Sequence, residues 1–225
     1  MRIGVIQHRL RTHERMDLAA MLAVSERASE DGIQVLVYPR VPGLRGSGLL
    51  DAFLRNVAER APGMSLVVPA IRHEGLGPLI PHLTGLGRTL ILSGDDCIDP
   101  ARFEEIQALE CDALVWLFDA EDALQAEAAL ELALDASLHL APLVVVAAAH
   151  GHARGFSTNG VSGMAYLGEI VSEGGPGDDL FVARVPAPAG FPERPRSLPE
   201  PAPVLQQRLA VRARMRAAAA EDAPY

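Results

Sequence analysis

The chain has 225 residues, 49% of them hydrophobic, and a formal net charge of −9. This length fits one large domain or two small ones, and the hydrophobic content suffices for a substantial core. The negative charge argues against a nucleic-acid-binding surface, because affinity for nucleic acid depends on clustered cations. No run reaches the roughly 18 uninterrupted apolar residues that a membrane-spanning helix needs, and the apolar run before His8 is too short for a signal peptide. We therefore expect a cytoplasmic protein that binds neither nucleic acid nor membrane.

Two residue types are informative because they are scarce. The two cysteines, Cys97 and Cys111, form neither a disulfide framework nor a metal quartet, which fits a reducing compartment. All 20 residues counted as Lys+Arg are arginines, so the chain contains no lysine. No mechanism that requires a lysine amine can operate in this chain.

The chain up to residue 149 alternates predicted strands with predicted helices, a pattern typical of layered α/β structure. Apolar runs predict strands at 2–8, 33–39, 64–71, 88–94, 111–118 and 142–149. Helical spacing predicts helices over 14–32, 48–63, 100–110 and 121–140. Consecutive strand–helix–strand units predict right-handed crossovers and helices that cover the faces of the sheet.

The pattern changes after residue 155. Two strand-like runs, 161–172 and 179–185, are separated by a glycine-rich turn and predict a hairpin at the edge of the sheet. Residues 186–203 are rich in proline and predict an extended tail outside the core. The final VLQQRLAVRARMRAAAA, with Arg208, Arg212, Arg214 and Arg216, can form a short basic helix that lies against the body or a partner. We expect a domain over 1–185 and an extension over 186–225.

The order of these segments resembles the nitrilase superfamily of carbon–nitrogen hydrolases over most of residues 2–185. RIGVIQH resembles the family's opening strand, which ends in glutamine, and IQVLVYPR resembles its strand that ends in an aromatic residue, proline and glutamate. Residues 87–117 resemble the nucleophile strand, the helix beyond it and the next strand, which opens with a small residue and Asp112. APLVVVAAAHG resembles the strand before the family's glycine turn, and GVSGMAYLGEIVSEG its closing Gly-x-Ser hairpin, with Gly168 at the bend.

This resemblance implies an α/β fold, a four-layer α-β-β-α sandwich of two mixed sheets, as a single domain with a C-terminal extension. It also implies a homodimer that pairs through helices, with which the apolar surface of the 121–140 helix is compatible.

The family's chemistry depends on a glutamate base, a lysine that stabilises the tetrahedral intermediate and a cysteine nucleophile. The resemblance places the glutamate at Arg40, whose guanidinium stays protonated and cannot accept a proton. It places the lysine between residues 71 and 88, where there is none. The cysteine position falls on Ser93, a poor nucleophile without a neighbouring base. All three catalytic roles are therefore predicted to be unfilled.

Cys97 offers a second alignment, because CIDP partly matches the family's cysteine–aromatic–aspartate run. That alignment moves the nucleophile beyond the end of the strand, so a buried structural thiol or a redox-sensitive thiol are the other interpretations. Asp95 and Asp96 fall where the family places acidic residues of the nucleophile loop. They can pair with Arg40 or cap the following helix, for which Asp99 is better placed, and Arg40 can also point into solvent.

The remaining motifs favour structural interpretations. His150 and His152 lie on a predicted turn without a third ligand close in sequence, so a solvated loop is favoured over a zinc site, and His8 and the pair His73-Glu74 are similarly isolated. Ser93 lacks the Gly-x-Ser-x-Gly context of a hydrolase triad. GLRGSG and GGPGDD lack the spacing and the lysine of a P-loop. We expect neither a metal nor another cofactor.

The sequence therefore predicts a pseudoenzyme, a catalytically inactive binding or scaffold subunit that forms a homodimer. Its predicted ligand-binding residues are Arg40, Ser93, Asp95 and Asp96, for a small anionic ligand, and a protein partner is the other possibility. The alternative is a carbon–nitrogen hydrolase that acts on an amide or nitrile through Cys97 or Ser93 with a non-standard base.

Overall fold

The computed structural model describes residues 1–40, 48–68, 79–83, 85–97, 99, 102–120, 122–153, 156–174 and 179–188. The predicted extension beyond residue 188 lies outside these residues, as does the segment 69–78. None of the described helices combines the length and the apolar content that a membrane crossing requires.

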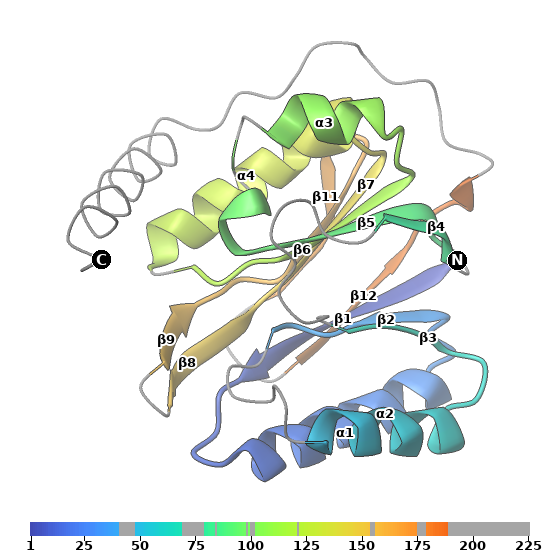
Figure 1. Cartoon of the computed structure of the whole chain (residues 1–225), viewed down its shortest axis with the longest axis vertical. Helices are drawn as coiled ribbons and strands as arrows, with labels where there is room; N and C mark the ends of the chain where they lie inside the picture. Colours follow the sequence, from blue (N-terminus) through green and yellow to red (C-terminus); the bar gives the residue numbers. More distant parts are fainter. Residues whose placement is uncertain are drawn as a thin grey trace, which may run out of the picture.

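The first sheet is built around strand β1 (Arg2–Arg9) and has the order β3-β2-β1-β8-β9, with β12 also paired to β1. Its other strands are β2 (Val35–Val37), β3 (Ser65–Val67), β8 (Ala149–Ala153), β9 (Phe156–Asn159) and β12 (Asp179–Arg184). Strands β1, β2 and β3 are parallel, whereas β12 runs antiparallel to β1. Helices α1 (Glu14–Glu30) and α2 (Leu49–Arg60) cover the outer face of this sheet (Figure 1).

The second sheet has the order β11-β10-β7-β6-β5-β4. Its strands are β4 (Leu79–Leu83), β5 (Gly87–Ser93), β6 (Ala113–Leu117), β7 (Leu143–Ala147), β10 (Gly163–Tyr166) and β11 (Glu169–Glu173). The three central strands, β5, β6 and β7, are parallel. A short 3-10 helix, η1 (Gly94–Cys97), follows β5, and helices α3 (Phe103–Ala108) and α4 (Ala123–His139) cover the outer face.

Buried apolar side chains fill three layers between these elements. Because successive side chains of a strand point to opposite faces, neighbouring residues belong to different layers. In β6, Val115 faces the first sheet while Trp116 faces α3 and α4. In β2, Val37 faces the second sheet and Leu36 faces α1 and α2. The result is the four-layer α-β-β-α sandwich, so the predicted fold class is confirmed.

The C-terminal strands differ from the sequence-based expectation. The run 161–172 folds by itself into the β10–β11 hairpin with Gly168 at its bend, as the resemblance implied. The run 179–185 forms β12, which pairs antiparallel with β1 in the first sheet rather than with this hairpin. The expectation of a hairpin between these two runs was therefore wrong.

Other elements also differ from the prediction, among them β9, which was not predicted. His150 and His152 lie within strand β8 rather than on a turn, paired with β1 on one side and β9 on the other. Strand β4 was not predicted, and it pairs antiparallel with β5. Helix α3 begins at Phe103 with Arg102 as its N-cap, so Asp99 does not have the predicted capping position.

Candidate functional site

The parallel strands of both sheets end at one rim of the sandwich. The inward-facing rows of β5 and β6 include Ile91 and Leu117, and the next side chains in these rows belong to Ser93 and Asp119. Polar side chains thus replace apolar ones where the core between the sheets ends. We call the following residues the rim site: Gln7 of β1, Arg40 after β2, Ser93 of β5 and Asp119 after β6.

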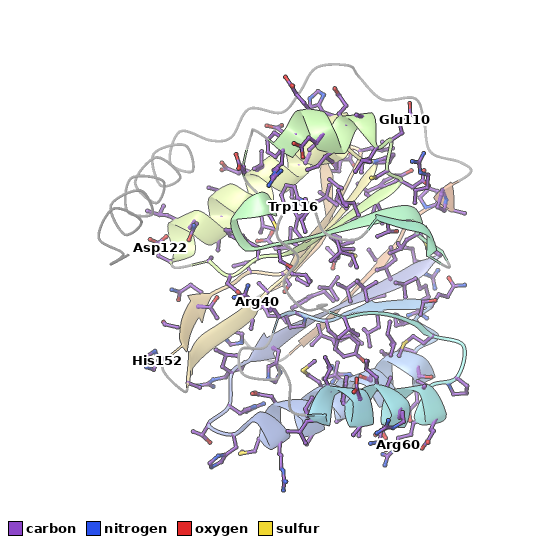
Figure 2. The ribbon with its side chains drawn as sticks, in the orientation of Figure 1. Arg40, Arg60, Glu110, Trp116, Asp122 and His152 are labelled. Carbon is purple, nitrogen blue, oxygen red and sulfur yellow. The ribbon has the colours of Figure 1, made fainter. Side chains whose placement is uncertain are left out.

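An ion pair joins the two sheets at the rim. Arg40 Nε lies 2.8 Å from Asp119 Oδ2, and the two side chains are 29% and 22% exposed. Figure 2 shows Arg40 between the two sheets. The chain before it is fixed, because Tyr38 N–H donates to the carbonyl of Val67 (2.9 Å) and both Tyr38 and Pro39 are buried. Among the described residues the guanidinium is recorded with Asp119 alone, which leaves its terminal N–H groups as donors for a further acceptor.

Ser93 is the last residue of β5, half-buried and in register with Leu117 of β6. The chain turns after it into the 3-10 helix η1, and Gly94 takes the left-handed conformation (φ +64°) that this turn requires. Asp95 and Asp96 follow in η1, but their side chains are not among those that the structure describes. Their predicted pairing with Arg40 stays a prediction, and the carboxylate that Arg40 contacts belongs to Asp119.

Cys97 lies on the other side of the second sheet from the rim site. Its thiol is fully buried in the apolar cluster between this sheet and helices α3 and α4, together with Leu92, Phe103 and Trp116. The turn of η1 carries the chain from the inner row that ends at Ser93 to this outer layer. The structure therefore does not bring Cys97 together with Arg40.

The Gly-x-Ser segment, residues 160–162, contacts Gln7 of the rim site. Ser162 N–H donates to Gln7 Oε1 (2.7 Å), and the Ser162 hydroxyl accepts from Ala148 N–H (3.0 Å). Gly160 permits this close approach, because a Cβ there would lie 2.3 Å from Ala148 Cβ. These contacts tie β1 to the end of β7, so Gln7 has a structural partner within the sandwich.

Two buried polar pairs lie between the first sheet and α1. The His8 imidazole donates through Nε2 to Asp17 Oδ1 (2.6 Å), which also accepts from Arg11 N–H (2.8 Å). The Tyr38 hydroxyl lies 2.6 Å from Ser25 Oγ. Burial raises the pKa of Tyr38 to about 12, and the hydrogen bond with Ser25 acts in the opposite direction. His8 therefore has a hydrogen-bonding partner on α1, which the sequence alone did not reveal.

No metal site is visible in the part of the chain that the structure describes, where no three or more His, Cys, Asp or Glu side chains gather as potential ligands. His152 is exposed on β8 (Figure 2), while His73 and Glu74 lie outside the described residues.

Asp119 is the rim residue that sequence reasoning missed. It directly follows the predicted strand 111–118, just as Arg40 directly follows the strand 33–39. Because parallel strands deliver their carboxyl ends to one edge, the same signal could have paired the two residues.

No protein-family model matches the chain, and no curated protein matches it either. The solved structures that it resembles include several of an amidase from Nesterenkonia sp. AN1. One, with the acetamide moiety of fluoroacetamide covalently added at the active-site cysteine, has a TM-score of 0.68 and 18% identity over 84% of this chain and 91% of that chain. A cysteine-to-serine variant of this amidase, described as from the nitrilase superfamily, has a TM-score of 0.63 and 18% identity over 83% and 92%. A third structure, with the same acetamide addition, covers 95% of this chain and 96% of that chain at 19% identity and a TM-score of 0.67.

Proposed function

We propose that this chain, which has the fold of the nitrilase superfamily, is a catalytically inactive binding or scaffold subunit. The observation that carries the proposal is the Arg40–Asp119 ion pair. It places a permanent cation after β2, where the family resemblance expects a general base. A guanidinium donates hydrogen bonds only, so it cannot activate a nucleophile by accepting a proton.

The candidate nucleophiles support the same conclusion. Cys97, the residue type that the resembled chemistry needs, is buried in the outer apolar layer. Ser93 does lie at the rim, but its hydroxyl needs a neighbouring base to become nucleophilic. Asp119 is the carboxylate that the described residues place at the rim, and it is paired with Arg40. An oxyanion formed there would also lack a lysine, since the chain has none.

The rim site fits a small carboxylate better than a neutral amide. Arg40 is held by one contact at Nε, so its terminal nitrogens can form the two parallel hydrogen bonds that carboxylates accept from arginine. Asp119 limits the affinity, because its negative charge repels an incoming anion. Ser93 ends β5, which pairs with β6, the strand before Asp119. The Ser93 hydroxyl can donate one more hydrogen bond to the ligand.

A panel of small carboxylates tests this binding by thermal shift. The full chain is expected to rise in Tm with at least one carboxylate, and Arg40→Met to lose that rise. Arg60→Met is the matched control, because Arg60 forms a surface ion pair with Glu26 on the helical layer away from the rim. A shift that persists in Arg40→Met would rule out Arg40 as the anion ligand. No shift with any carboxylate would leave the scaffold role alone.

The alternative function is an amide or nitrile hydrolase that uses Ser93 or Cys97, and the position of Ser93 at the rim is the observation in its favour. Ammonia release from a panel of small amides and nitriles, together with labelling by iodoacetamide at pH 6, tests it. We expect no ammonia above a heat-treated control and slow labelling of Cys97. Turnover that disappears in Ser93→Ala or Cys97→Ala would refute the pseudoenzyme proposal.

A further inference from the structure

The rim site carries one cation and one anion in contact with each other. Arg40 and Asp119 are both partly exposed, so a ligand from solvent can reach both groups. A simple carboxylate is attracted by the guanidinium but repelled by Asp119, and these two contributions oppose each other. A ligand that carries a cation beside its carboxylate is attracted by both side chains. The charges of the site therefore match a zwitterion better than an anion.

The contact between the two side chains allows both of these interactions at once. Asp119 Oδ2 contacts Arg40 at Nε, while the other N–H donors of the guanidinium belong to its terminal nitrogens. A carboxylate can accept about four hydrogen bonds, so Asp119 can receive an ammonium group in addition to the contacts that it already makes. A zwitterion can thus bind without separating Arg40 from Asp119.

The short distance within the pair limits the spacing of the charges in the ligand. Because Nε and Oδ2 lie only 2.8 Å apart, the complementary charges of the ligand must also lie close together. In an α-amino acid the ammonium and the carboxylate are attached to one carbon atom. The core under the pair is filled, since Leu117, two residues before Asp119, and Val37, three residues before Arg40, are fully buried. The ligand is therefore held through its charged groups, which favours a small amino acid.

Ser93 adds a hydroxyl group beside the pair. It ends β5 in register with Leu117 of β6, the strand that Asp119 follows. The Ser93 side chain is half-buried, and no hydrogen bond of its hydroxyl is recorded in the described part of the chain. A hydroxyl both donates and accepts, so it can contact either the carboxylate or the ammonium of a ligand. The hydrogen-bonding capacity of Ser93 thus fits the same class of ligand.

We propose that the rim site binds a small α-amino acid, with the carboxylate on the terminal nitrogens of Arg40 and the ammonium on Asp119. This inference rests on the proposed binding of a carboxylate at Arg40 and adds the second charged group of the ligand. Asp119 then determines specificity, because it weakens the binding of simple carboxylates and strengthens the binding of zwitterions. An amine without a carboxylate gains only the contact with Asp119.

Alanine and propionate are matched probes, since they have the same carbon skeleton and differ in the ammonium group. Thermal shift of the full chain with each probe, at equal concentration and ionic strength, measures the preference. Amino acids also stabilise proteins as excluded osmolytes, so the shift that remains in Arg40→Met is subtracted. We expect the corrected shifts to correspond to an affinity for alanine several-fold above that for propionate. Ethylamine, which carries the cation alone, should give a smaller corrected shift than alanine.

Asp119→Asn keeps a side-chain oxygen for Arg40 Nε but removes the negative charge. We expect this variant to lose the preference, because the shift with alanine should fall while the shift with propionate should rise. Glu26→Gln is the matched control, since Glu26 pairs with Arg60 in the helical layer away from the rim. This control should retain the preference for alanine.

The outcomes separate this inference from the proposed function. If propionate or ethylamine shifts the unmodified chain as much as alanine does, the amino-acid ligand is ruled out, and an equal shift with propionate leaves carboxylate binding at Arg40 intact. A preference for alanine that persists in Asp119→Asn would also overturn the inference, because the ammonium would then lie elsewhere. No corrected shift with any probe would overturn both the amino-acid ligand and carboxylate binding, and leave the scaffold role alone.

Discussion

The two halves of the sandwich hold their helices by different means. In the first half, α1 faces its sheet with buried polar groups, including Asp17 against His8 and Ser25 against Tyr38. In the second half, α4 faces its sheet mainly with alanine and leucine, and the cluster beneath it contains Trp116 and Cys97. The buried polar side chains of the described second half include Thr89, Gln125, Ser137 and Ser162, none of which is acidic or imidazole.

This difference shows how each half selects one arrangement. Apolar packing stabilises any close fit of the right volume. A buried polar pair is hydrogen-bonded only when both partners lie opposite each other. Asp17, Met21 and Ser25 follow one another along one face of α1, so the two pairs fix both its rotation and its position along β1 and β2. The first half should therefore respond to loss of polar groups and to pH, and the second half to loss of volume.

Removing the largest side chain of the second half should have the greatest effect. Trp116 is fully buried, and Trp116→Ala should lower the free energy of unfolding by about 3–5 kcal/mol because it loses apolar burial and leaves a cavity. Urea denaturation measures the change. Trp116→Phe is the control and should cost less, since the indole N–H has no hydrogen-bond partner among the described residues. Equal losses for both variants would contradict a contribution from volume.

Breaking the buried pair of the first half should have the next largest effect. Asp17→Ala removes the oxygen that accepts from His8 Nε2 and Arg11 N–H, and it should lower the free energy of unfolding by about 3 kcal/mol. Asp17→Asn keeps a side-chain oxygen at this position and should cost only about 1 kcal/mol. The comparison uses the same urea titration. If both variants were as stable as the parent chain, the pair would not be what positions α1.

Much of the fold could be predicted because the central strands are continuous apolar runs. Strands such as β6 and β7 are buried on both faces. Their continuous apolar sequences must lie at the centre of a sheet that is covered on both sides, which leaves few other folds. Strands β4 and β8 escaped prediction because LIPHL and AHGHA contain proline, glycine and histidine, which carry little strand signal. Their pairing depends on neighbours that are distant in the sequence.

The candidate site could be predicted only in part, for a similar reason. Arg40 and Ser93 follow apolar runs, so their place at the rim follows from the strand order. The side of the sheet that Cys97 occupies depends on the turn at Gly94 and η1, and period-two alternation does not extend through such a turn. His8 and Asp17 could not be paired from periodicity, because the contact depends on how α1 is seated on β1.

The pH dependence of stability should also differ between the two halves, with a smaller effect than the two substitutions above. Burial raises the pKa of Tyr38 from 10.0 to about 12, so the unfolded chain releases this proton at a lower pH than the folded chain. The free energy of unfolding should therefore fall as pH rises from about 10 to about 12, by about 1.4 kcal/mol per pH unit at most. Urea titrations across this range measure the slope, and Tyr38→Phe should remove most of it. Tyr166→Phe is the control and should retain the larger part, because Tyr166 is only half-buried.

The smallest effect should come from the ion pair that joins the halves. Arg40 and Asp119 are each partly exposed, so solvent screens their attraction and the coupling energy should be below about 1 kcal/mol. A double-mutant cycle of Arg40→Ala, Asp119→Ala and the double variant measures it, with Arg60 and Glu26 as a reference cycle within the first half. A coupling well above 2 kcal/mol would show that the pair is a structural clasp between the sheets. A weak coupling would instead show that Asp119 orients Arg40 through Nε without holding the sheets together, while the terminal nitrogens of Arg40 face a ligand.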